Sequence, residues 1–236
     1  MLDKYLPNHV EDEAWINWQN AIDLYYDENY SSSAQAFVMN TSHRIVEAPL
    51  KNLHFERVLE IGAGTGKHFE FIKHRFVEYT VSDANLKMLE QAKKNLARYN
   101  DPRIKFAQYN GENISVADSS YDRIVAMHVL EHLPNPHLCI KEWLRVVKNG
   151  GMISCLIPTD PGLMWRIGRA IGPRRKALRA GLNYDYIMAR EHINSCTNLI
   201  AFFEYYFKKS NVCWWPLKIP TPDLNLFAYI NFKVEK

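Results

Sequence analysis

The stretch Val58-Leu-Glu-Ile-Gly-Ala-Gly-Thr-Gly-Lys-His68 decides how this chain folds. Residues 58–61 form a short, mostly apolar run of the kind that makes a buried strand. Glycines follow at alternate positions, and a helical pattern opens at Lys67. Because glycine lets the backbone approach a ligand closely, this order of strand, glycine turn and helix predicts a ligand-binding corner.

The spacing of the glycines narrows the class of ligand. A dinucleotide-binding turn reads G-x-G-x-x-G, but this turn reads G-x-G-x-G, and Lys67 stands where that pattern has its third glycine. The strand also carries an acid, Glu60, two residues before the first glycine. A carboxylate there would repel a pyrophosphate, whereas it suits a ligand that carries an amine and a sulfonium. The alternative is a glycine turn with no ligand.

This E-x-G-x-G-x-G stretch resembles the first motif of class I S-adenosylmethionine-dependent methyltransferases, and the resemblance extends over residues 56–158. The block from Tyr121 to Ile157 resembles the type 11 subgroup, which includes ubiquinone-biosynthesis O-methyltransferases. The resemblance implies an α/β fold, with a Rossmann-like seven-stranded sheet, its last strand antiparallel, and helices on both faces. It also implies S-adenosylmethionine as cofactor, S-adenosylhomocysteine as product, and methyl transfer to an oxygen or nitrogen.

The predicted cofactor contacts lie where strands end. Asp83 lies 17 residues beyond Gly66, after the strand 76–81, where a carboxylate can accept both hydrogen bonds of a ribose diol. Its alternative role is to cap the helical run 86–99. The resemblance places adenine after the strand 104–108, where Asn110 replaces the family's usual Asp. The full predicted set is Glu60, Gly62, Ala63, Gly64, Gly66, Asp83, Ala84, Asn110, Gly111, Glu112, Met127 and His128.

Two histidines are candidates for a catalytic base, because imidazole titrates near neutral pH and an oxygen acceptor must lose a proton. His128 follows the strand 121–127, and His192 lies where the family builds its acceptor pocket. His128, Glu131 and His132 also match the H-x-x-E-H zinc-protease signature, which we reject because the segment follows a strand in an α/β alternation. Relatives with E-x-x-E-H there bind magnesium. One imidazole replaces a carboxylate here, and magnesium prefers oxygen ligands, so no metal site is expected.

The chain is expected to be a single domain over residues 1–236, with additions around a cofactor-binding core at 56–158. Residues 1–50 are expected to form a helical cap, 159–193 a basic insertion, and 211–236 a strand pair. The insertion has no acid from Pro161 to Tyr184 and contains Arg166, Arg169, Arg174, Arg175, Lys176 and Arg179. It predicts a helix lying on anionic lipid, a lid for an anionic acceptor, or a solvated face. We favour the lid, because Tyr184, Tyr186 and His192 follow directly.

Composition excludes several functional classes. The 236 residues are 47% hydrophobic and 23% charged, as in an ordinary soluble domain, and contain no apolar run long enough to span a membrane. A net charge of +3 is too small to indicate nucleic-acid binding. Four cysteines without a C-x-x-C pair are typical of reduced thiols in a cytoplasmic protein. If the basic insertion lies on anionic lipid, the cytoplasmic protein is also expected to contact the inner face of the membrane peripherally.

The acceptor is expected to be a small molecule or a lipid- or glycan-linked anionic compound, and the sequence does not predict an oligomeric state. Two other functions are kept as alternatives. One is a non-catalytic partner protein that only binds the cofactor. The other is an RNA methyltransferase, which rests on the basic insertion and the H-x-x-E-H segment, since no RNA-binding module is recognisable elsewhere.

Overall fold

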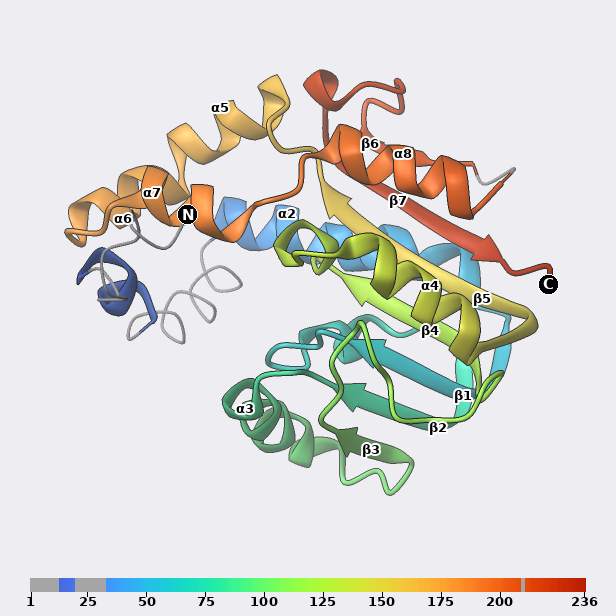
Figure 1. Ribbon diagram of the computed structural model, residues 1–236. Helices are drawn as coiled ribbons and strands as arrows, with labels where there is room; N and C mark the ends of the chain where they lie inside the picture. Colours follow the sequence, from blue (N-terminus) through green and yellow to red (C-terminus); the bar gives the residue numbers. More distant parts are fainter. Residues whose placement is uncertain (1–12, 20–32, 209–210) are drawn as a thin grey trace, which may run out of the picture.

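A seven-stranded sheet in the order β3-β2-β1-β4-β5-β7-β6 forms the centre of the computed structural model, which describes residues 13–19, 33–208 and 211–236 (Figure 1). The strand β7 lies between β5 and β6 and is antiparallel to both, while the other neighbours are parallel. This confirms the predicted fold. The strands are β1 (His54–Ile61), β2 (Arg75–Ser82), β3 (Ile104–Ala107), β4 (Tyr121–Met127), β5 (Val147–Pro158), β6 (Cys213–Pro216) and β7 (Asn225–Lys233).

The described helices begin at recognisable capping residues. The Asn85 side chain caps α3 by accepting a hydrogen bond from the Lys87 N–H, so the cap of this helix is Asn85 and not Asp83. Ser195 caps α8 in the same way, and Pro136 opens α4 at a position where a missing N–H costs nothing. The helices are one at 13–19, α2 (Ser33–Glu47), α3 (Leu86–Leu96), α4 (Pro136–Val146), α5 (Leu163–Ile171), α6 (Pro173–Arg179), α7 (Tyr184–Glu191) and α8 (Cys196–Tyr206).

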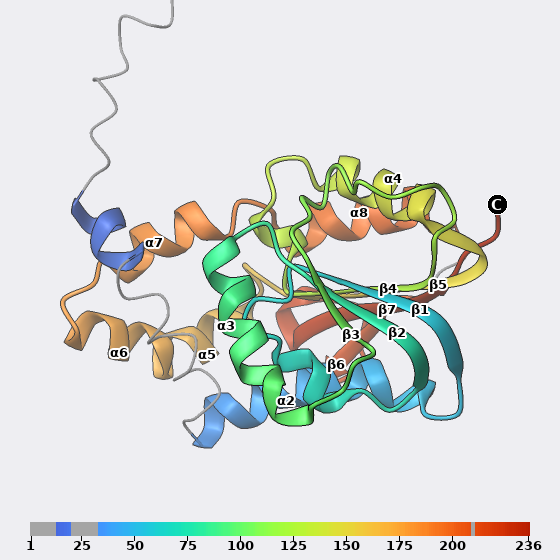
Figure 2. The same cartoon turned by 90° about the horizontal axis from the view of Figure 1, so that it is seen from below.

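Successive side chains along each strand point to opposite faces of the sheet, so the core consists of two apolar layers. Val58 packs with residues of α3, whereas its neighbour Leu59 belongs to the cluster formed with α4 and α8. In β4, Val125 packs toward α2. The helices α2 and α3 therefore cover one face of the sheet, and α4 and α8 cover the other (Figure 2). Glu60 and Arg123 share the α2 face, because β1 pairs in register with β4.

Several predicted boundaries were wrong. The run after the glycines is a short 3₁₀ helix, η2 (Lys67–Phe71), and not the start of a long helix. The helical run predicted over 86–99 is α3 followed by a 3₁₀ helix at 97–99, and the strand predicted over 104–108 ends at Ala107. Of the helical cap expected over residues 1–50, the structure describes residues 13–19 and 33–50.

The insertion lies beyond the carboxyl ends of the parallel strands, where it continues from β5 as α5, α6 and α7 (Figure 1). Ligands of open α/β sheets bind at this edge, so the insertion stands over the predicted cofactor corner. The remaining 3₁₀ helices are η1 (Ala48–Leu50), η3 (Ala97–Tyr99), η4 (Leu130–His132) and η5 (Pro222–Leu224). Among the described residues, no helix is long and apolar enough to cross a membrane.

Candidate active site

The glycine turn after β1 brings bare backbone to the ligand edge of the sheet. Gly62, Gly64 and Gly66 have φ angles of 64°, 54° and 78°, in the left-handed region that favours glycine. A Cβ atom at Gly62 would lie 2.6 Å from Cγ2 of Val129, so this position has no room for a side chain. The Ala63 N–H donates to the Ser82 carbonyl at 2.9 Å and ties the turn to β2.

Two carboxylates flank the turn. Glu60 is 2% exposed, and its Oε2 accepts a hydrogen bond from the Tyr79 hydroxyl at 2.8 Å. Burial raises the pKa of Glu60. At the end of β2, Asp83 accepts the Gly64 N–H at 2.9 Å and the Asn85 N–H at 2.8 Å. These bonds fix its orientation, and each oxygen keeps capacity for a further donor, as a ribose diol requires.

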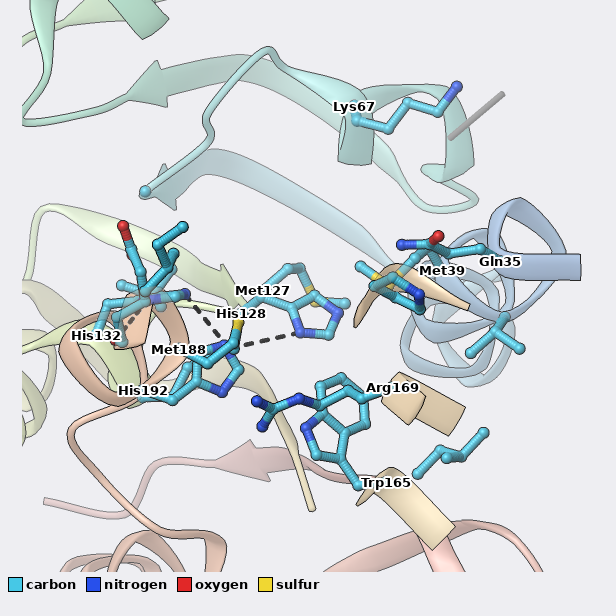
Figure 3. Close-up of a pocket in the computed structure, with 18 of the residues that line it drawn as sticks. Gln35, Met39, Lys67, Met127, His128, His132, Trp165, Arg169, Met188 and His192 are labelled. Carbon is cyan, nitrogen blue, oxygen red and sulfur yellow. Dashed lines mark hydrogen bonds and ion pairs between the residues drawn. The ribbon is translucent and has the colours of Figure 1, made fainter. Parts of the chain in front are cut away.

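A cavity of about 790 Å³ extends from this corner under the insertion. The predicted residues that line it are Glu60, Gly62, Ala63, Asp83, Met127, His128 and His192. His132 and His192 lie on one side of it, Gln35 and Met39 of α2 lie on the other, and His128 lies between them (Figure 3). The cavity therefore joins the predicted cofactor corner to both candidate bases.

The other predicted cofactor residues lie elsewhere. Gly64, Ala84, Asn110, Gly111 and Glu112 are not among the described residues that line the cavity, and Gly66 lines a separate hollow of about 260 Å³. The Asn110 side-chain oxygen is occupied by the Glu112 N–H at 3.0 Å. The assignment of adenine to residues 110–112 therefore stays a prediction.

His192 has the geometry of an oriented base. Its Nδ1 lies 2.9 Å from Oδ2 of Asp160, and the same oxygen accepts from Arg169 Nη1 at 3.0 Å. Burial opposes ionisation of Asp160, but the hydrogen bond from His192 and the charge of Arg169 outweigh it and lower its pKa. An ionised Asp160 holds the proton of His192 on Nδ1, which leaves Nε2 as the acceptor.

His128 occupies a strained position beside a buried acid. Its φ angle is 58°, which is rare for a residue with a side chain. Its Nε2 lies 3.1 Å from the Ser42 hydroxyl, and its Nδ1 lies 3.6 Å from Oε1 of Glu131. Glu131 is 1% exposed, and its Oε2 has no hydrogen-bond partner among the described residues. Such an orphaned buried oxygen is an available acceptor for a bound ligand.

Two residues of the cavity, Glu191 and Trp18, lie outside the predicted set of site residues. Glu191 lies 3.3 Å from Nδ1 of His132 through Oε2, and its Oε1 accepts the Trp18 indole N–H at 2.9 Å. Burial opposes its ionisation, but the His132 and Trp18 hydrogen bonds lower its pKa. Adjacency to His192 was the available signal for Glu191. Nothing in the sequence links it to Trp18, which is 173 residues away.

A buried polar network ties α2 to the sheet and was also missed. Glu47 is fully buried, lies 2.7 Å from Arg123 Nη1, and has His68 and His74 nitrogens each 3.1 Å from its carboxylate. Burial raises the pKa of Glu47, but Arg123 and the two imidazoles outweigh it and lower the pKa far below its ordinary value. His43 Nδ1 lies 3.0 Å from His68 Nδ1 and extends the network to the cavity wall.

The structure changes the interpretation of the basic insertion. Two of its six cations are neutralised by acids just outside the acid-free stretch: Arg169 pairs with Asp160, and Arg174 pairs with Asp185 at 2.7 Å. Only Arg169 and Lys176 of the six line the cavity. Tyr184 also lines it, whereas Tyr186 is not among its described lining residues. No group of three or more His, Cys, Asp or Glu residues could hold a metal ion within the described part of the chain.

Comparisons with known proteins identify the core. Residues 59–155 match the family model described as a methyltransferase domain. The matched residues form a methyltransferase domain. The chain is 31% identical over 137 residues to the phosphatidylethanolamine N-methyltransferase of Cereibacter sphaeroides, covering 57% of this chain and 66% of that protein. It is also 28% identical over 107 residues to the ubiquinone biosynthesis O-methyltransferase of Paracidovorax citrulli, covering 45% of this chain and 44% of that protein.

Solved structures share the fold over most of the chain. A SAM-dependent methyltransferase from Aquifex aeolicus has a TM-score of 0.56 at 15% identity, over 82% of this chain and 92% of that one. The YcgJ protein of Bacillus subtilis has a TM-score of 0.56 at 16% identity, over 84% of this chain and 100% of that one. This chain spans less than two thirds of the length of the curated relatives named above.

The family and fold imply S-adenosylmethionine as the cofactor, and the residues present fit it. The glycine turn has no room for a side chain at Gly62, Asp83 keeps free acceptor capacity, and Glu60 lies on the cavity wall. Glu60 and the turn would hold the methionine end, and Asp83 the ribose. A cavity of about 790 Å³ is within the usual range for a site that holds a small molecule.

Proposed function

We propose that this chain transfers a methyl group from S-adenosylmethionine to an oxygen or nitrogen of a lipidic acceptor. The observation that carries the proposal is the continuity of the cavity, which has Asp83 and the glycine turn at one end and His192 at the other. Beside His192 the cavity lining also includes the apolar side chains of Trp165, Ile187 and Met188. Such a lining suits an acceptor with an apolar body and one polar group.

The protein's own residues have few tasks in this reaction. When bound, S-adenosylmethionine supplies a methyl group activated by its sulfonium. The protein's part is to align the acceptor, exclude water and remove a proton from the nucleophile. Asp160 orients His192 so that Nε2 can take this proton, and Trp165 lies against the His192 ring with centroids 6.3 Å apart. His128 is the second candidate for the same role.

Carboxylates near the histidines favour an amine or hydroxyl acceptor over a carboxylate. Glu131 and Glu191 both line the cavity, and burial leaves one oxygen of Glu131 without a partner. An amine could donate to these oxygens. The similarity to an enzyme named phosphatidylethanolamine N-methyltransferase is consistent with such a group. Lys67, Arg169 and Lys176 also line the cavity, so an anionic group elsewhere on the acceptor is accommodated.

The test is transfer of a labelled methyl group. The protein would be incubated with methyl-labelled S-adenosylmethionine and separate acceptors, including phosphatidylethanolamine vesicles, demethylated quinone precursors and an RNA pool. We expect label in a lipid-soluble product and in no RNA. Cofactor binding with no transfer to any acceptor would support a non-catalytic binding protein instead, and labelled RNA would favour the RNA methyltransferase.

A further inference from the structure

The helix α5 exposes an apolar stripe that no described residue covers. Leu163, Ile167 and Ile171 recur every fourth residue, so they lie along one side of the helix. They are 51%, 47% and 63% exposed, and Leu178 of α6 is 47% exposed. Side chains of this kind are normally found in a core, and none of the nine residues of α5 is buried. A contiguous exposed group of this size marks a contact surface.

The cationic residues beside this stripe are of two kinds. Arg169 and Arg174 are engaged by Asp160 and Asp185. The side chains of Arg166, Arg175 and Arg179 make no hydrogen bond or ion pair with any residue that the structure describes. The apolar stripe and these three arginines all lie on α5 and α6. Exposed apolar side chains therefore adjoin cations that pair with no described acid. This combination is typical of a helix that lies in a membrane interface.

The C-terminal hairpin adds to the same region. The N-terminal end of α5 abuts η5, where the Leu163 N–H donates to Asp223 at 3.0 Å. Just before η5, Leu217 and Ile219 are 53% and 46% exposed and flank Lys218. We define the α5 face as these residues with the stripe and its cations: Leu163, Arg166, Ile167, Ile171, Arg175, Leu178, Arg179, Leu217, Lys218 and Ile219.

We propose that the α5 face docks on an anionic lipid bilayer. A bilayer supplies an apolar region beneath a negatively charged surface, which matches both kinds of side chain at once. The face also borders the cavity, because Ile171, Gly172 and Pro173 line it. Docking would therefore hold the cavity rim against the membrane. The inference rests on the surface alone and does not require the proposed methyl transfer.

Flotation with vesicles tests this directly. The wild-type chain would be mixed with vesicles of phosphatidylcholine alone or of phosphatidylcholine with phosphatidylglycerol. We expect binding to the anionic vesicles, weakened at high salt, because about 1 M salt shortens electrostatic screening to roughly 3 Å. The double variant R175A/R179A should bind roughly 30-fold more weakly, since each basic residue near such a surface contributes about fivefold. The variant L163S/I167S should also lose most of its binding.

A matched control is L53S/V77S, which removes two exposed apolar side chains from the β1–β2 region, far from α5 in Figure 1. It should bind like the wild type. Cofactor affinity, measured on every variant, should be unchanged and reports that the fold is intact. Absence of wild-type binding to anionic vesicles, or equal loss in the control, would overturn the proposal. So would a wild-type dimer that L163S/I167S converts to a monomer, because a second copy would then cover the face.

Discussion

Asp160 sets the orientation and the tautomer of His192 through one contact. The 2.9 Å distance between Oδ2 and Nδ1 fixes the ring, and the low pKa of Asp160 keeps the carboxylate ionised to accept the Nδ1 proton. The ring of His132 lies edge-on, with its centroid 5.0 Å from that of His192. This arrangement leaves one nitrogen of His192 available to the acceptor.

Replacing His192 by Asn should reduce kcat by roughly 100-fold or more, the usual contribution of a positioned base. The affinity for S-adenosylmethionine should not change, because the cofactor corner lies at the other end of the cavity. The measurement is the rate of methyl transfer against acceptor concentration, which gives kcat separately from KM. The control is H137N, because His137 packs against Phe202, with centroids 5.9 Å apart, and is not among the described lining residues. An unchanged kcat in H192N would remove His192 from the reaction.

At the scale of elements, α2 is held to the sheet by a network of charged residues. The network is buried, so water does not screen it. Glu47 and Arg123 are both fully buried, whereas Arg57 and Glu78 form a similar pair at 2.9 Å with side chains 43% and 31% exposed. Removing one partner of a buried pair leaves an uncompensated charge, while an exposed pair is screened by water.

The variant E47Q should therefore lower the free energy of unfolding by about 3–5 kcal/mol. The matched variant E78Q should lower it by less than about 1 kcal/mol. Urea unfolding followed by circular dichroism measures both values. Equal effects of the two substitutions would mean that the buried network does not hold α2.

Acid should destabilise the folded chain through the same network. Burial and repulsion from His68 hold the pKa of His43 well below 6.5, and burial lowers the pKa of His74 although Glu47 opposes the change. As the pH falls, both imidazoles therefore become protonated at a higher pH in the unfolded chain than in the folded chain. The free energy of unfolding should fall below about pH 6.5 by about 1.4 kcal/mol per pH unit for each residue. A series of urea titrations between pH 7 and 5 measures the slope, and a flat profile would contradict it.

Sequence reasoning predicted the parts whose signal is local. The glycine spacing, Glu60 and the strand-terminal Asp83 were all visible within one stretch or at one strand end, and Glu60, Gly62 and Asp83 line the cavity. The network around Glu47 could not be predicted, because its partners come from separate elements that only the sheet brings together. The neutralised state of Arg169 and Arg174 was missed for a related reason: the acids lie just outside the stretch examined, at Asp160 and Asp185.

At the scale of the whole molecule, the cavity wall comes from distant parts of the chain. Trp18 lies near its beginning, the glycine turn follows β1, and His192 lies beyond the insertion. The complete wall therefore exists only when these parts of the folded chain are brought together. One cavity can in this way offer contacts to both a cofactor and an acceptor.

Chelation tests whether the histidine side of that cavity needs a metal. His128 supplies an imidazole where relatives that bind magnesium have a carboxylate, and magnesium prefers oxygen ligands, so methyl transfer should be unchanged by a chelator. The assay is activity with and without chelator, followed by added magnesium or zinc. Loss of activity that a divalent metal restores would place His128, Glu131 and His132 in a metal site.

Calorimetric titration with S-adenosylhomocysteine tests the central claim, that the corner formed by the glycine turn and Asp83 holds the cofactor. We expect one site on the wild-type chain and a loss of about 2–3 kcal/mol of binding free energy in D83A, because charge-assisted hydrogen bonds to the ribose are removed. The matched control D101A removes an acid that is bound to Arg103 away from the cavity, and it should bind like the wild type. No binding to the wild type, or equal binding by D83A with its fold intact, would contradict the account.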